Sequence, residues 1–89
     1  MKRQNYLETL AEREGAELTA YSPLQLLFLT RLSDLLRLRH DCVKLVSEDN
    51  WRIRLLNKAL YSTYRDCVAQ GVEMEASALF DIEKESPDE

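Results

Sequence analysis

Residues 22–46 read SPLQLLFLTRLSDLLRLRHDCVKLV, the longest stretch of the chain with apolar residues at helical spacing. Its first residues are typical of a helix start: Ser22 as the cap, Pro23 at the first helical position and Gln25 where a side chain reaches back to the cap. Apolar residues then recur at helical spacing. The pattern therefore predicts one long helix over residues 24–46.

Arg39 is the unusual residue of this helix. On a helix that turns about 100° per residue, it lies inside the main apolar face, and a guanidinium is not buried without a partner. Three explanations remain open: an acidic partner within the chain, for which Glu14 and Asp81 are candidates, a contact with another chain, or a head group that reaches water along its apolar stem. The face itself consists of Leu24, Phe28, Leu32, Leu35, Leu36, Cys42, Val43 and Val46.

The apolar arc of the same helix is wider than one neighbour requires. A flank of Leu27, Leu38 and Leu45 widens it to roughly 200°, so the helix must be covered from two directions. We expect a second copy of the chain to provide the second cover by two-fold pairing. The alternative is a monomer in which the terminal segments cover the helix. The predicted contacts with a second copy or another protein partner are Leu27, Leu38, Arg39 and Leu45.

The remaining sequence predicts three further helices, none of them longer than the helix expected over residues 24–46. A capping pattern at Asn5 starts a short helix that Gly15 closes, and a third helix is expected over residues 51–70, with Gly71 just after its end. A last short helix is expected over residues 72–82.

These elements predict an all-α fold. It is a long antiparallel helical hairpin with short flanking helices, paired into a dimeric helical bundle. Residues 1–82 form a single helical domain, and residues 83–89 form a flexible acidic C-terminal tail.

The net charge of the chain limits the kinds of partner that it is expected to bind. The chain of 89 residues has a formal net charge of −4, which argues against general affinity for nucleic acid or for acidic membranes. The third helix nevertheless carries a strip of cations and aromatic rings that is able to grip phosphates or stack on bases. The same pattern also fits an ordinary solvated helix face. The strip consists of Trp51, Arg54, Lys58, Tyr61 and Arg65.

Catalytic and metal-binding patterns are missing from the sequence. His40 is the only histidine and has no nucleophile at a suitable spacing. Cys42 and Cys67 each stand in an Asp-Cys-Val triplet, but a hairpin that turns near residues 47–50 separates them by roughly 15 Å along the helices. This exceeds the Cα separation of about 7 Å that a disulfide tolerates. We predict buried cysteines and expect no catalytic residue, cofactor or metal.

The functional expectation follows from these points. We expect a non-catalytic small helical interaction or regulatory protein that binds a protein partner. The alternative is a nucleic-acid-binding module that uses the strip on the third helix. Because the N-terminus lacks an apolar secretory segment and no apolar run approaches the ~20 residues of a membrane span, a cytoplasmic location is expected.

Overall fold

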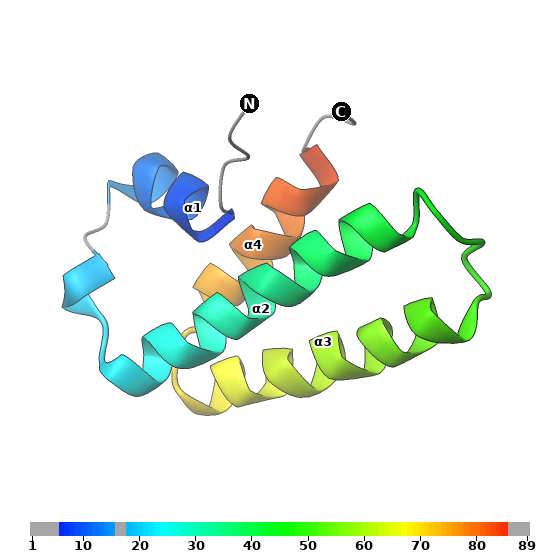
Figure 1. The fold of residues 1–89 in the computed structure, drawn as a ribbon. Helices are drawn as coiled ribbons and strands as arrows, with labels where there is room; N and C mark the ends of the chain where they lie inside the picture. Colours follow the sequence, from blue (N-terminus) through cyan, green and yellow to red (C-terminus); the bar gives the residue numbers. More distant parts are fainter. Residues whose placement is uncertain (1–5, 16–17, 86–89) are drawn as a thin grey trace.

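The computed structural model describes residues 6–15 and 18–85, which form α-helices, one short 3-10 helix and no strand (Figure 1). The prediction of an all-α fold is confirmed. The elements are α1 (Tyr6–Glu14), η1 (Leu18–Ala20), α2 (Pro23–Cys42), α3 (Trp51–Ala69) and α4 (Glu73–Glu85).

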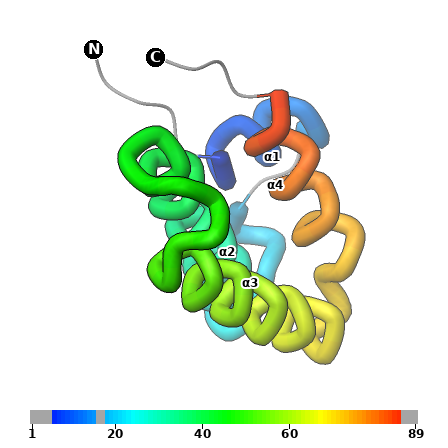
Figure 2. The backbone as a smooth tube through the Cα atoms, turned by 90° about the vertical axis from the view of Figure 1, so that its right-hand side faces the viewer, coloured from blue at the N-terminus to red at the C-terminus, as the bar shows by residue number. Residues whose placement is uncertain are grey.

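The two longest helices, α2 and α3, lie side by side and run antiparallel (Figure 1). The α1 and α4 helices pack against each other and against one side of α2, and α4 also contacts α3 (Figure 2). Helix α2 therefore contacts all three other helices. In Figure 2 the side of α2 that faces away from α1 and α4 is not covered by any of the described helices.

The start of α2 has the predicted cap. The Gln25 backbone N–H donates to Ser22 Oγ at 3.1 Å, and the Ser22 N–H donates to the Gln25 side-chain oxygen at 2.9 Å. The Gln25 amide also donates to the Gln70 carbonyl at 2.9 Å. The cap thus satisfies the first turn of α2 and connects it to the end of α3.

Gly71 ends α3 as predicted. Its φ of +77° lies in the left-handed region that favours glycine. The Val72 N–H bonds to the Cys67 carbonyl, and the Gly71 N–H bonds to the Val68 carbonyl. These two bonds are the pattern that turns a chain sharply after a helix, and they direct α4 back across the hairpin.

The core lies between the α2–α3 pair and the α1–α4 pair. Each helix contributes a stripe of side chains to it, so the structure has a single core shared by all four helices. Its buried apolar residues are Tyr6, Leu7, Leu10, Leu29, Leu32, Leu36, Leu60, Cys67, Val72, Ala76, Leu79 and Ile82.

Two helix boundaries differ from the prediction. Helix α2 ends at Cys42 rather than near Val46, and the chain continues in turns in which the Lys44 and Leu45 N–H groups donate three residues back to the Asp41 and Cys42 carbonyls. Helix α4 continues to Glu85, past the predicted end at Ile82, and Glu85 forms an ion pair with Arg13 of α1 at 2.7 Å. The predicted cap at residue 5 and the end of the predicted tail, residues 86–89, lie outside the described residues.

Candidate interaction surface

The two faces of α2 differ in how they are covered. Its inner face, toward the core, buries Leu29, Leu32, Ser33, Leu36 and His40. The predicted face was centred about a quarter turn away, so it included residues that the structure leaves exposed and omitted three that it buries. The predicted apolar face of α2 was therefore wrong in part. It omitted the buried residues Leu29, Ser33 and His40, and it included the exposed residues Leu24 and Val43.

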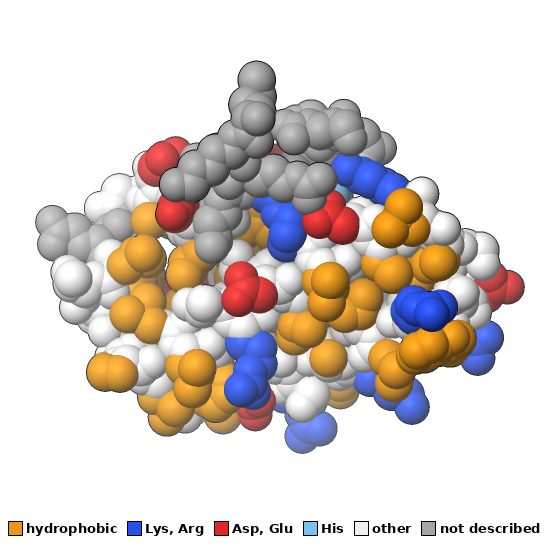
Figure 3. All heavy atoms as spheres, viewed as in Figure 1, with side chains coloured by type: hydrophobic (Ala, Val, Ile, Leu, Met, Phe, Trp, Pro, Cys, Tyr) orange, Lys and Arg blue, Asp and Glu red, His pale blue; other side chains and the backbone are white. Residues whose placement is uncertain are grey.

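The outer face of α2 carries the predicted flank. Leu27 is 50% exposed, Leu38 is 56% exposed, and Leu45, in the turn after the helix, is 83% exposed. On a helical projection this flank lies almost opposite the buried stripe. Hydrophobic side chains accordingly gather on the face of the molecule that Figure 3 shows, with charged side chains between them.

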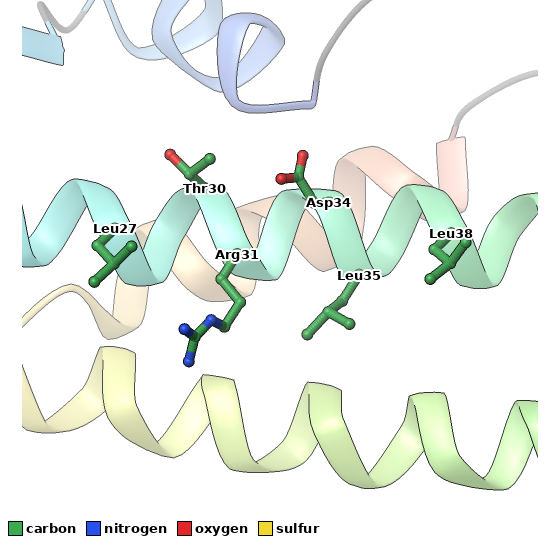
Figure 4. A pocket seen from close by; sticks show the side chains of 6 residues that line it. All are labelled: Leu27, Thr30, Arg31, Asp34, Leu35 and Leu38. Atoms are coloured by element: carbon green, nitrogen blue, oxygen red, sulfur yellow. The ribbon is translucent and has the colours of Figure 1, made fainter.

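Part of this face forms a shallow groove of about 340 Å³ (Figure 4). Leu27 and Leu38 stand at its two ends, and Arg31 and Asp34 stand between them. The Arg31 guanidinium lies 6.0 Å from the centre of the Phe28 ring. We call this surface the outer groove; its lining residues are Leu27, Thr30, Arg31, Asp34, Leu35 and Leu38.

Arg39 is not part of the outer groove. It is half-buried in a different hollow of about 540 Å³, where Asp81 of α4 is also a lining residue. Arg39 Nε is buried and has no hydrogen-bond partner among the described residues. Of its proposed acidic partners, Asp81 shares the hollow without forming an ion pair, and Glu14 is exposed on α1. The other lining residues of this hollow are Asn57, Leu60, Tyr61, Tyr64, Ser77 and Phe80.

His40 is buried on the inner face of α2. Its Nδ1 lies 3.7 Å from a carboxylate oxygen of Glu83, and both side chains are nearly covered. This distance is longer than a hydrogen bond. The contact joins the last turns of α2 and α4, so Glu83 is part of the folded domain rather than of a tail. The spacing of His40 from Leu32 and Leu36 was the sequence signal for its burial.

The predicted strip on α3 consists of five exposed residues on one side of that helix. Three of them are already engaged within the chain: the Arg54 guanidinium donates to the Asp49 carbonyl at 2.9 and 3.2 Å, and the Arg65 guanidinium lies 5.9 Å from the Tyr61 ring centre. The Trp51 ring contacts Arg52, which is not part of the strip: the Arg52 guanidinium lies 4.5 Å from the centre of the ring.

The two cysteines occupy different surroundings. Cys67 is fully buried, and burial raises the pKa of its thiol to about 11, with the charge of Asp66 acting in the same direction. Cys42 is half-buried at the end of α2, and both are free thiols. Both cysteines were predicted to be buried, and this is confirmed for Cys67 but not for Cys42. A neutral buried thiol is a poor nucleophile, so Cys67 acts as a core residue.

Comparison with known proteins adds no functional information: neither a protein-family model, nor a curated protein, nor a solved structure matches the chain. Among residues 6–15 and 18–85, no three His, Cys, Asp or Glu side chains are grouped to hold a metal ion. None of the helices in these residues has the length and apolar content that crossing a membrane requires. Function is therefore inferred from the surfaces described above.

Proposed function

We propose that this chain is a non-catalytic helical interaction protein that binds a protein partner through the outer groove, and that this partner is a second copy of the chain. One observation carries the proposal. Leu27 and Leu38 remain about half exposed on a helix that buries Leu29, Leu32 and Leu36 completely. Exposed apolar side chains with polar neighbours on one face are typical of protein–protein contacts.

The expected affinity is modest. Full burial of a leucine side chain contributes about 1.5–3 kcal/mol, and side chains that are already half covered contribute about half of that. Leu27 and Leu38 from two copies then give about 4 kcal/mol, which is near the lower end of the cost of association. The remaining affinity must come from Leu35 and from the charged pairs of the groove. We expect reversible pairing with a dissociation constant in the micromolar range or weaker.

Sedimentation velocity over micromolar to millimolar concentrations tests this proposal. The native chain of 10.4 kDa is expected to approach twice that mass as its concentration rises. The Leu38→Glu variant is expected to stay at 10.4 kDa with an unchanged circular-dichroism spectrum, because the substitution places charge on the interface and leaves the core intact. Met74→Glu is the control, since Met74 is 84% exposed on α4 and away from the groove.

The opposite results are equally clear. A native chain that stays monomeric at millimolar concentration contradicts self-association. Equal loss of association in Leu38→Glu and Met74→Glu means that added negative charge, rather than the groove, controls assembly.

The second candidate function is nucleic-acid binding by the strip on α3. The observation in its favour is that Trp51, Lys58 and Arg65 are all exposed on one side of the helix. The net charge of −4 works against it. Fluorescence anisotropy with a labelled single-stranded oligonucleotide at low and high salt separates the two functions. Salt-sensitive binding by the native chain that Lys58→Glu abolishes would place this function first.

A further inference from the structure

Four of the six residues that line the outer groove, two leucines and two opposite charges, are arranged symmetrically along α2, and the third equidistant pair is Thr30 and Leu35. Leu27 and Leu38 are equally distant from the midpoint between Leu32 and Ser33, and so are Arg31 and Asp34. Leucines therefore occupy the two ends of the groove, with opposite charges nearer its centre (Figure 4). When a second copy of α2 runs in the opposite direction, leucines therefore face leucines and opposite charges face each other.

We propose that two copies pair through antiparallel α2 helices, with a two-fold axis at this midpoint. In such a pairing each residue faces the one at the equivalent distance on the other side of the axis. Leu27 then meets Leu38 of the second copy, and Arg31 meets Asp34 of the second copy. Because the axis is two-fold, each of these contacts occurs twice in the dimer. The inference rests on the proposed function and specifies its partner and its register.

Spacing along the helix supports this arrangement. Leu27, Arg31, Asp34 and Leu38 follow one another at intervals of four, three and four residues. Alternating intervals of three and four keep side chains on one line along a helix, which is the geometry of two-helix seams. The leucines and the charges thus share one face of α2, on which Arg31 points toward α3 and Asp34 points away from it (Figure 4).

Other pairings of the same helix are less favourable. A parallel pairing in register places Arg31 against Arg31 and Asp34 against Asp34 of the second copy, so like charges meet. An antiparallel pairing shifted by one heptad places Asp34 against Leu38, or Arg31 against Leu27. Buried unpaired charges carry a large desolvation cost. Of these registers, only the symmetric one pairs leucine with leucine and cation with anion.

A charge-exchange experiment tests the register. Arg31→Asp places a carboxylate opposite Asp34 of the second copy, and Asp34→Arg creates the corresponding repulsion between cations. Each single variant is expected to weaken dimerisation about tenfold or more, and the double variant that exchanges both charges is expected to recover most of the native affinity. Lys58→Asp on the exposed side of α3 is the control, because it changes net charge as Arg31→Asp does. Circular dichroism checks that each variant keeps its helices.

Directed cross-linking provides a second test. Chains with Leu27→Cys mixed with chains with Leu38→Cys are expected to form a disulfide between positions 27 and 38, identified by peptide mass spectrometry. Either variant alone is expected to give no link between identical positions, because residues 27 and 38 lie about 16 Å apart along a helix.

The results separate this inference from the proposed function. A native dimer whose affinity changes no more in the charge variants than in Lys58→Asp overturns the register and leaves self-association intact. A link between identical positions overturns the antiparallel pairing. A native chain that is monomeric throughout overturns both.

Discussion

The two faces of α2 differ more than its sequence suggests. Leu29 and Leu36 on the inner face are fully buried, whereas Leu27 and Leu38 on the outer face are about half exposed. All four are leucines in one helix, so hydrophobicity and helix propensity are the same for each of them. The difference arises because α1, α3 and α4 together cover the inner side of α2 and leave the outer side open. Inner leucines therefore stabilise the monomer, whereas the outer ones carry the self-association that we propose.

The largest expected effect separates these two roles directly. Leu36→Ala removes fully buried methyl groups and is expected to lower the free energy of unfolding by about 2–5 kcal/mol. Leu38→Ala is expected to change it by no more than about 0.5 kcal/mol. Urea unfolding at a concentration well below the expected dissociation constant measures both. Similar losses for the two variants would show that the outer face also belongs to the monomer core.

The next effect concerns the inner core through Cys67. Because burial raises the pKa of this thiol to about 11, above its value in the unfolded chain, the folded state holds the proton more tightly at alkaline pH. Stability is therefore retained below about pH 9 and falls as pH rises toward about 11. The loss is on the order of 2 kcal/mol.

Urea unfolding at a series of pH values measures this loss. In Cys67→Ala the decline between pH 9 and pH 11 is expected to be smaller, although Tyr21 contributes in the same direction. The pKa of Tyr21 is raised chiefly by burial, and also by its hydrogen bond to Glu75. An equally steep decline in the variant would assign the pH dependence to groups other than this thiol.

The smallest effect lies at the α3–α4 corner, away from both faces. Gly71→Ala places a side chain at a φ of +77° and is expected to cost about 1 kcal/mol of stability without changing self-association. Gln70→Ala, at the preceding residue with a φ of −90°, is the control and is expected to be nearly neutral. Thermal unfolding and sedimentation together measure the two properties. A change in association for Gly71→Ala would link the corner to the outer face.

Local signals explain which parts of the fold were predictable. Ser22 and Gln25 specified the start of α2, and Gly71 specified the end of α3, because caps depend on a few neighbouring residues. These predictions are confirmed by hydrogen bonds and backbone angles.

The orientation of α2 was not predictable in the same way. Leucines occur on almost every side of this helix, so periodicity alone does not determine which side faces the core. The packing of α1, α3 and α4 against α2 determines it, and many of these contacts join residues that are far apart in the sequence. The same contacts bury His40 beside Glu83 and place Arg39 in a separate hollow.

The candidate surface was predicted in part. Leu27, Leu38 and Leu45 were selected because the apolar arc was too wide, and all three are exposed. Arg31 and Asp34 were missed, because charged residues on an exposed face are ordinary when they are considered singly. Their symmetric placement between Leu27 and Leu38 was the available signal.

Leucine methyl NMR spectra recorded over a dilution series show whether the outer leucines form an interface while the inner ones form the monomer core. We expect the methyl signals of Leu27 and Leu38 to shift as the protein is diluted, because these side chains leave an interface. The signals of Leu29, Leu32 and Leu36 are predicted to stay constant, because the monomer core is unchanged. Dilution shifts confined to the inner leucines, or no shift at Leu27 and Leu38 up to millimolar concentration, would contradict the account.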